Sequence, residues 1–549
     1  MAVATLHNVA RMILWATAIW LFRQCHKAPE DFVVSCGALI CLWVVLKSFV
    51  ICLRTLNRRH SSPLKGIPGP ESINWLYDHV FDIFDEPLAF NITKWINQRP
   101  YPAGLMHFFG LFGSSYIIPT TPETLKDVLS THAYDYEKAT AFKTYTTRFW
   151  GHGIVSQEQE EHRQNRKTYL PVFNQGNVRK LAGTLFTKAT QFADRISDPE
   201  FADDSPPPHL RRAGVSSAVV PIVKLSALIS LDVTGILAFG VDFETILGRR
   251  PEIFEAHETL FASTKEKRRL FLLYNLAPRW LIYLIPFPVA RKMDQARTLL
   301  YNVCRETIRQ QRRAPSDPDE AQPLHFLGHL KKTDGLREEE AAIAQIVVIL
   351  GAGTGGTLAW VFNCLAAHPQ SQDAIRRELA GCQDEPDADY DQLPMLHAVV
   401  MEAVRLYPGF TFLLRKAIRD TTIGDQPIPR NTFVGLCTRA INYAEHLWGP
   451  DAAAFVPERW LERSPEGRGI RINPLGGAPA AVCMLSFFHG TRSCVGRELA
   501  LAQMKRQIAV VVRRFRLETV GGAEDVRPCG LFATTPPPDL LVRFTELEG

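Results

Sequence analysis

The segment from Phe487 to Gly496 carries the residue types best suited to holding a redox cofactor. It fits the pattern FxxGxRxCxG, whose fixed positions are Phe487, Gly490, Arg492, Cys494 and Gly496. The glycines would let the backbone approach a flat cofactor closely, and Arg492 could neutralise a carboxylate on it. A helical pattern over residues 497–515 would place a helix amino terminus beside Cys494 and favour its thiolate.

The alternative is that Cys494 is a structural cysteine buried in a turn, the usual role of a single cysteine. Five pattern positions filled together argue against that interpretation. An axial thiolate pushes electron density through a heme iron and favours O–O cleavage more than histidine does. The segment therefore indicates a thiolate ligand for a metal cofactor.

This segment resembles the heme-binding loop of the cytochrome P-450 family, which implies heme b with Cys494 as the axial ligand to iron. Glu402 and Arg405, followed by Pro408, resemble the family's ExxR helix, and residues at i and i+3 share a helix face and can pair. Arg459 resembles the arginine that joins the pair. ExxR alone occurs by chance on many helices, but its position upstream of Cys494 gives it weight. The resemblance implies that these three residues lock the core beneath the heme.

Three further residues follow from the same resemblance. His162 and Arg166 resemble the family's WxxxR sequence on the helix flanking the heme, with histidine in place of tryptophan. Both residue types can donate to a heme propionate, so the role survives the change; the alternative is a solvated basic helix face. Arg415 would contact the other propionate.

The resemblance covers residues 66–547 and is closest to fungal members. It implies the cytochrome P-450 fold, mainly α with a minor β-sheet region, in a monooxygenase that inserts one oxygen atom from O2 into a lipophilic small molecule, within secondary-metabolite biosynthesis. The residues favour the same fold class. Helical periodicity dominates residues 123–406, and β-branched residues with turn signals over 413–434 indicate a small sheet.

The chain departs from the family at the oxygen-activating helix, which usually carries a glycine, an acid and a threonine. Counting from the start of the matching stretch, 345–357, puts Gly355 and Gly356 at the acid–alcohol positions. Counting back from His368 puts Ala352 and Gly353 there. Neither register supplies a carboxylate, so Thr354 and Thr357 are the candidate catalytic hydroxyls. Each glycine costs a helix about 1 kcal/mol relative to alanine, and we expect the helix to open or distort here.

The missing acid leaves other functions open. The chain could be a P-450-type isomerase or dehydratase that acts without external O2, or a heme-binding protein without catalysis. Residues Gly351 to Gly356 also fit GxGxxG, the fingerprint of FAD- and NAD-dependent oxidoreductases. Against that fingerprint, the preceding residues 336–344 are charged and helical in pattern, and no βαβ unit is evident around it.

The amino-terminal residues 1–60 read as a membrane anchor. Residues 32–53 are almost wholly apolar and as a helix would span about 33 Å, enough for the hydrocarbon core of a bilayer. Arg54, Arg58 and Arg59 follow, which predicts a cytosolic catalytic domain. The resemblance implies that the membrane is that of the endoplasmic reticulum. Residues 12–22 are short for a span and favour an interfacial helix. Residues 61–70 form a proline-rich hinge, and residues 71–549 the heme-thiolate catalytic domain.

Composition excludes several classes of function. With 46% apolar and 22% charged residues the chain is globular, and a net charge of +5 is too small to indicate nucleic acid. The 11 cysteines are an odd number without a CxxC pair, which predicts reduced thiols in a reducing compartment.

The electrons are expected from a separate chain, since the sequence leaves too little room after Cys494 for a flavin domain. The resemblance implies an NADPH–cytochrome P-450 reductase on the same membrane. A basic patch around the cysteine helix would attract an acidic flavin domain. The residues expected in that patch are Arg166, Lys167, Arg497, Lys505 and Arg506.

Overall fold

A computed structural model of the chain describes most of it in atomic detail. The described residues are 41, 45, 48–53, 55–79, 81–84, 89–198, 217–277, 279–313, 325–332, 339–382, 385, 388–464, 469–521, 526–530 and 532–548. The helices are α3 (Phe90–Gln98), α4 (Pro122–Lys126), α5 (Thr140–Phe149), α6 (Gln159–Phe173), α7 (Gln175–Lys180), α8 (Ala182–Ile196), α9 (Ile222–Phe239), α10 (Pro251–Phe261), α11 (Lys265–Leu276), α12 (Arg279–Leu284), α13 (Pro288–Arg313), α14 (Phe326–Lys332), α15 (Glu339–Gly351), α16 (Gly355–Ala367), α17 (Pro369–Leu379), α18 (Pro394–Leu406), α19 (Thr438–Asn442), α20 (Glu445–Trp448) and α21 (Arg497–Arg514).

Within the part of the chain that the structure describes, the strands are short and form four small sheets. They are β1 (Leu105–Phe109), β2 (Ser115–Pro119), β3 (Tyr136–Lys138), β4 (Ser217–Pro221), β5 (Phe412–Ala417), β6 (Thr421–Ile423), β7 (Gln426–Ile428), β8 (Phe433–Cys437), β9 (Leu461–Arg463), β10 (Ile470–Ile472), β11 (Phe515–Thr519) and β12 (Leu541–Glu546). The largest sheet has the order β1-β2-β8-β5-β3, and a second has the order β11-β12-β4.

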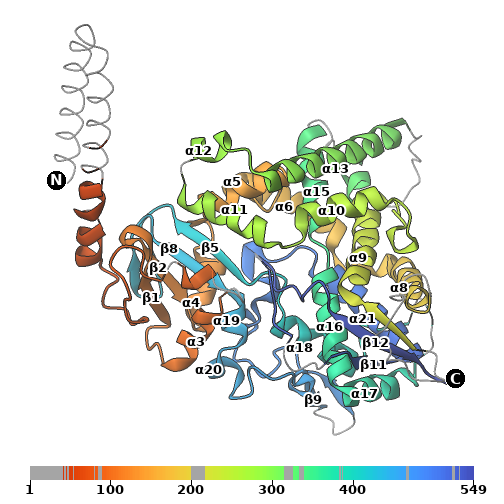
Figure 1. The fold of residues 1–549 in the computed structure, drawn as a ribbon. Helices are drawn as coiled ribbons and strands as arrows, with labels where there is room; N and C mark the ends of the chain where they lie inside the picture. Colours follow the sequence, from red (N-terminus) through yellow and green to blue (C-terminus); the bar gives the residue numbers. More distant parts are fainter. Residues whose placement is uncertain are drawn as a thin grey trace.

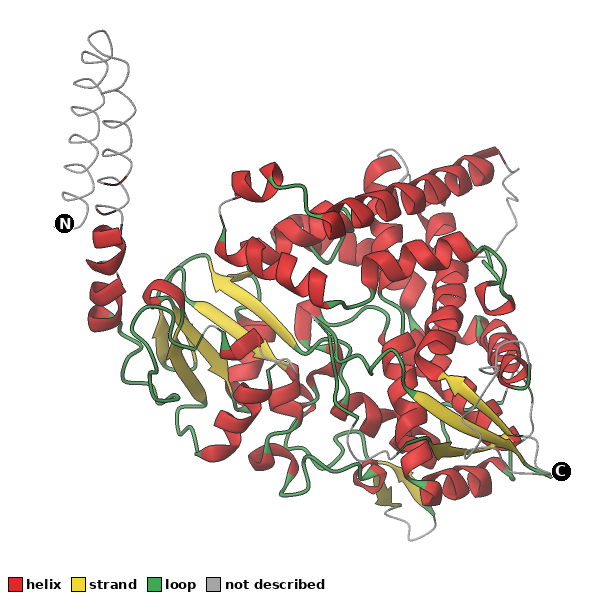
Figure 2. Cartoon of the chain, viewed as in Figure 1, coloured by secondary structure: helices red, strands yellow, loops and turns green. Residues whose placement is uncertain are grey.

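Helices make up most of the molecule, with the five-stranded sheet at one side (Figures 1 and 2). This confirms the expected fold class, mainly α with a minor β region. The small sheet expected over residues 413–434 is also confirmed, because β5 to β8 occupy 412–437. In that sheet β5 pairs with β8 in antiparallel register, with Arg415 opposite Val434.

Among the described residues, two apolar helical stretches, Ile222–Phe239 and Glu339–Ala367, are long and apolar enough to cross a membrane. Most residues of α9 and α16 are nevertheless buried in the protein, and the two helices pack against each other. A helix that is apolar on all sides is typical of the interior of a large domain as well as of a membrane span. Here these helices form the core.

The glycine-rich stretch breaks the long core helix, as its composition predicts. Helix α15 ends at Gly351 and α16 begins at Gly355, with Ala352 to Thr354 outside either helix. Glycine also lets α9 approach the break: a Cβ added to Gly353 would lie 2.2 Å from Ser230 Oγ, and one on Gly355 would lie 2.9 Å from Ala227 Cα. The break therefore follows from close packing as well as from low helix propensity.

The dinucleotide-binding interpretation of Gly351 to Gly356 is wrong. That fingerprint requires a strand before the glycines, so that the turn and the following helix cradle a pyrophosphate. The glycines instead connect two helices in the core.

The amino-terminal predictions lie largely outside the described residues. Residues 12–22 are not described, and of the span 32–53 only residues 41, 45 and 48–53 are. Residues 48–53 and 55–61 are helical, and Val45, Phe49 and Leu56 are exposed. The proline-rich segment 61–70 forms turns that lie against β1, where His107 N donates to Pro68 O at 3.0 Å.

A substitution pair tests the packing at the helix break. A Cβ added to Gly351 would lie 2.1 Å from the Phe261 ring, whereas one on Gly356 meets only the Thr535 methyl at 3.4 Å. We expect Gly351→Ala to lower the free energy of unfolding by about 1–3 kcal/mol through overpacking. Gly356→Ala should leave it unchanged or raise it by up to about 1 kcal/mol. Urea unfolding measures both, and equal effects would contradict the packing described here.

Candidate active site

The loop that carries Cys494 is held by its own backbone and by neighbouring elements. Cys494 N donates to Phe487 O at 2.7 Å, which closes the loop, and α21 begins directly after Gly496. Gly490 has a φ of 70°, and a Cβ there would lie 2.2 Å from Leu129 O. Only glycine fits this close approach in a left-handed conformation.

The Cys494 side chain is exposed, although protein atoms pack closely around its sulfur. Desolvation by the surrounding protein raises the pKa of the thiol, and it outweighs the Gly496 N–H, Arg166 and Arg497, which act to lower it. The residue is exposed all the same, because the protein packs around the sulfur without covering every side. A cysteine in this setting can reach a ligand held against the loop, and a bound metal cation would favour its thiolate.

Arg166 lies at the cysteine loop. Its Nη1 donates to Ser493 O at 2.5 Å and its Nη2 to Ser493 Oγ at 2.9 Å, so α6 is fastened to the residue before Cys494. The structure thus brings Arg166 beside the sulfur, where its positive charge favours the thiolate.

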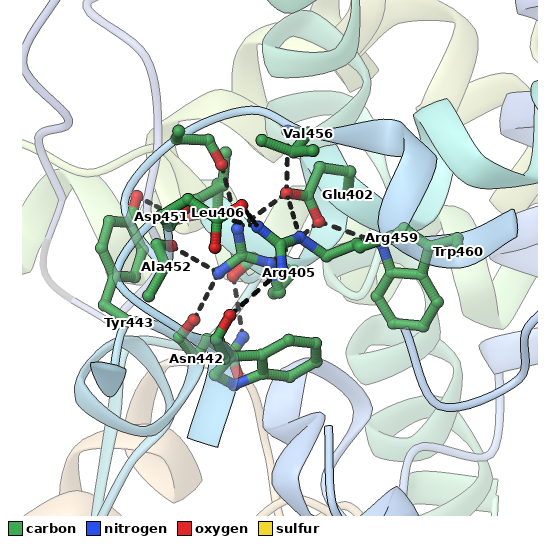
Figure 3. Close-up of polar contacts among 12 residues, drawn as sticks. Glu402, Arg405, Leu406, Asn442, Tyr443, Asp451, Ala452, Val456, Arg459 and Trp460 are labelled. Atoms are coloured by element: carbon green, nitrogen blue, oxygen red, sulfur yellow. Dashed lines mark hydrogen bonds and ion pairs between the residues drawn. The ribbon is translucent and has the colours of Figure 1, made fainter. Parts of the chain in front are cut away.

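Glu402 and Arg405 form a fully buried ion pair on α18. Arg405 Nη2 lies 2.7 Å from Glu402 Oε1, and Arg405 Nε lies 2.9 Å from Oε2. Arg459 Nε and Trp460 Nε1 each donate to the same carboxylate at 2.9 Å (Figure 3). The geometry agrees with the trio expected from the sequence, and Trp460 completes it.

The pair also anchors the backbone around it. Arg405 Nη1 donates to Asn442 O at 2.5 Å and to Ala452 O at 2.6 Å, and Nη2 donates to Ala454 O at 3.1 Å (Figure 3). The chain after β8 is thereby fixed against α18. With every donor and acceptor engaged, the buried charges avoid most of the penalty of desolvation.

Asn442 carries this anchorage to the cysteine loop. Its Oδ1 accepts from Leu485 N at 3.1 Å, and its Nδ2 donates to Ser486 Oγ at 2.8 Å. Ser486 Oγ in turn donates to Val404 O at 2.7 Å on α18. These residues directly precede Phe487, so α18 and the cysteine loop are held in one register.

A cluster of buried cations lies beside the loop. Lys138 on β3 stands directly opposite Arg415 on β5, and Arg492 is also buried. Glu158 is the carboxylate that serves the cluster, 3.8 Å from Lys138 Nζ and paired with Arg492 Nη1. Like charges opposite each other on neighbouring strands are destabilising, so three cations around one carboxylate call for a further anion.

The ionisation of the cluster reflects that excess of positive charge. Burial first, and then Arg492 and Arg415, lower the pKa of Lys138 to about 7. Burial and then Arg492 lower the pKa of Arg415 to about 9. Arg415 Nε and Nη1 have no hydrogen-bond partner among the described residues, although the side chain is buried.

His162 on α6 completes the polar side of the site. It is buried, and its Nδ1 lies 3.2 Å from Tyr134 OH. Burial and the nearby Lys138 and Arg492 lower its pKa to about 3, so the ring is neutral at physiological pH. If Nδ1 accepts from Tyr134, Nε2–H remains a donor, which is the function expected of the tryptophan that it replaces.

These residues fit heme b. Its propionates would supply the missing anions beside the unpartnered Arg415 and the crowded Lys138 and Arg492, and Cys494 would supply the axial thiolate.

The candidate hydroxyls lie at the helix break and at the start of α16. Thr354 Oγ1 is buried without a hydrogen-bond partner among the described residues. Thr357 is partly buried, and its Oγ1 would lie 3.9 Å from a Cβ on Gly409, in the turn after α18. The Thr354 hydroxyl at the break, like the Ser230 hydroxyl that packs against it, therefore has no hydrogen-bond partner among the described residues.

Sequence reasoning missed Lys138 and Glu158, because single charged residues in a short strand and a loop carry no pattern. It also misassigned Lys505 and Arg506 to a basic surface patch. Both are buried, 3% and 5% exposed, and lie against Asp391 at 3.3 Å and 3.9 Å. Helix α21 is buried on nearly all sides, so its basic residues face protein. Lys167 and Arg497 are exposed.

Comparison with known proteins gives a consistent family. A family model described as cytochrome P450 matches residues 68–543. The chain is 30% identical to the cytochrome P450 monooxygenase ptmK of Penicillium ochrochloron, over 88% of this chain and 94% of that protein. It is 29% identical to the cytochrome P450 monooxygenase buaD of Petromyces alliaceus, over 89% of each, and 28% identical to sphH of Aspergillus fumigatus, also over 89% of each.

The buried ion pair on α18 makes a stability prediction. Glu402→Gln keeps the side-chain shape but leaves the buried Arg405 charge without its carboxylate, so we expect a loss of about 3–5 kcal/mol in the free energy of unfolding. Glu462→Gln is the matched control, because its pair with Arg471 is exposed and should contribute little. Urea titrations of both variants decide the matter. A Glu402→Gln protein as stable as the control would show that the pair does not hold the core.

The ligand assignment makes a spectroscopic prediction. Cys494→Ser should abolish the shifted Soret band that the reduced, carbon monoxide-treated holoprotein gives with a thiolate ligand. Cys483→Ala serves as control, because Cys483 is buried and burial raises the pKa of its thiol to about 11. The control should keep the band. The opposite pattern would make Cys483 the ligand.

Proposed function

The chain belongs to the cytochrome P450 family and is a monooxygenase of that family, and we propose on this premise that it inserts one oxygen atom from O2 into a lipophilic small molecule. One observation carries the proposal: the accessible Cys494 lies beside a cluster of buried cations, Arg415, Lys138 and Arg492. Several of its relatives are fungal monooxygenases, which supports a role in secondary-metabolite biosynthesis.

Heme b with an axial thiolate supplies the oxygen-activating redox chemistry when bound. The protein's own contribution begins with Cys494, whose thiolate Arg166 and the Gly496 N–H stabilise. Arg415, Arg492 and His162 hold the carboxylate side of the cofactor through charge and hydrogen bonding. Glu402, Arg405 and Arg459 keep the loop in place from behind.

Thr354 and Thr357 are the proposed proton-handling groups. The buried, unpartnered Thr354 Oγ1 can hold a water molecule at the broken helix, and the two together can relay a proton. A hydroxyl with water then takes over the task for which relatives use an acid–alcohol pair. The missing carboxylate also favours the second candidate, an isomerase or dehydratase that needs no external O2.

Isotope labelling separates the two candidates without knowledge of the substrate. Cultures that carry the intact gene and cultures that lack it are grown under 18O2, and their metabolites are compared by mass. A monooxygenase predicts a metabolite that depends on the gene and carries one added 18O atom. Thr354→Ala should lower the yield of that metabolite while the purified variant keeps its thiolate Soret band. A gene-dependent metabolite without label would favour rearrangement or dehydration.

The proposed partner is a separate NADPH–cytochrome P450 reductase on the endoplasmic reticulum membrane. Lys167 follows Arg166 on α6, Arg497 is the first residue of α21, and both are exposed, so we infer that docking uses them without the buried Lys505 and Arg506. The exposed apolar side chains of Val45, Phe49 and Leu56 support an anchor in the bilayer, with the catalytic part in the cytosol.

A further inference from the structure

Among the described residues, Arg415 and Arg439 are the buried arginines in which two guanidinium nitrogens lack a hydrogen-bond partner. Arg415 is accounted for by the heme carboxylates proposed above. Arg439 is not: it lies on α19, its side chain is 9% exposed, and its Nε and Nη1 are both unpartnered. An arginine stays charged in a protein, so this cation needs a compensating group.

No carboxylate in the described part of the chain forms an ion pair with Arg439. The ring of Tyr443 lies 4.4 Å from its guanidinium carbon, which gives partial compensation through the π face. The ionisable groups that feel its charge are Cys437, Tyr407 and Tyr443. Burial raises the pKa of each, so all three are neutral at physiological pH. The positive charge therefore remains unbalanced.

A small cavity adjoins this guanidinium. Its volume is about 10 Å³, and Thr411, Arg439, Cys529, Gly530 and Thr534 are among its lining residues. A volume of that size admits a single atom-sized guest, such as a water molecule or a monatomic ion. The hydroxyls of Thr411 and Thr534 lie 3.0 Å apart in its lining; because one donates to the other, the pair keeps one O–H donor for a guest.

The cavity is separate from the candidate heme site. Arg439 N donates to Thr411 O at 3.4 Å, whereas Arg415 lies four residues further along the same strand segment. Four residues of extended chain correspond to about 13 Å. The charges that shift the pKa of Arg415 come from Arg492, Glu158 and Tyr134, and Arg439 is not among them, so the two guanidinium groups lie in different surroundings.

We propose that Arg439 and the threonine hydroxyls bind one small monovalent anion, with chloride as the physiological occupant. A negative charge is required because water would satisfy the N–H groups but leave the charge unbalanced. The site needs nothing from the proposed oxygenation reaction and stands independently of it.

The anion would fasten residues 528–530 and 532–535 to α19. That segment already joins the core, since Thr411 N donates to Phe532 O at 2.8 Å and Trp360 Nε1 donates to Thr534 O at 2.9 Å. Phe532 lies in an aromatic cluster, with ring centroids 5.3 Å from Phe142 and 4.7 Å from Phe271. An anion at Arg439 therefore stabilises a segment that packs on α5, α11 and α16.

The experiment uses the full-length holoprotein and bromide as the probe. Crystals grown with sodium bromide should show an anomalous peak beside Arg439 Nε and Nη1. In solution, replacing sodium gluconate with sodium chloride at constant ionic strength should raise Tm saturably, by about 2 °C. Arg439→Gln should lose this rise, whereas Arg430→Gln, at an exposed arginine, should keep it.

Each result decides for or against the site. Bromide density and a chloride response lost only in Arg439→Gln support it. A peak-free cavity that contains water, or a chloride response that Arg439→Gln retains, overturns it. If Arg439→Gln fails to fold, the wild-type anomalous map decides alone. Heme spectra recorded in both salts should be the same, which separates this site from any failure of the proposed reaction.

Discussion

The buried Glu402–Arg405 pair is the interaction on which the rest of the structure depends. Two charges without solvent are tolerated only when every lone pair and proton has a partner, and here the partners come from distant parts of the chain. Arg459 and Trp460 arrive on one side, and the carbonyls of Asn442 and Ala452 on the other. The hydrogen bonds of the Glu402–Arg405 pair form only when all these partners are in place, so the pair fixes the arrangement of the segments that flank the cysteine loop.

Local sequence patterns predicted the fold class and those parts of the site whose residues are close together in the sequence. The cysteine loop, the i, i+3 pair on α18 and the strands after it follow from spacing, because each depends on residues close in the sequence. Lys138 facing Arg415 depends on the pairing of β3 with β5, which no local pattern contains. The burial of Lys505 and Arg506 was missed for a related reason: α21 is polar in composition, and only its tertiary neighbours, Asp391 among them, explain why it is buried.

Glycine serves two different purposes near the site. In the cysteine loop it admits a left-handed conformation against Leu129 O. In the core it ends one helix, and it lets α9 lie against the next one at Gly353 and Gly355. The low helix propensity of the glycine-rich stretch is evident in the sequence. The sequence does not show that α9 is the helix that packs against these glycines. Ser230, which touches the break, has no sequence feature that marks it.

The pairing of β4 with β12 has a consequence for how the chain is made. Strand β4 has β12 as its sheet neighbour, and more than three hundred residues separate them in the sequence. At about 5–20 residues per second on the ribosome, roughly 15–60 seconds pass between their syntheses. During that interval the open edge of β4 and the apolar α9 that follows it are exposed to other strands and to chaperones. Codon choice across that interval, as much as the amino acids themselves, would then influence how much native protein a cell obtains.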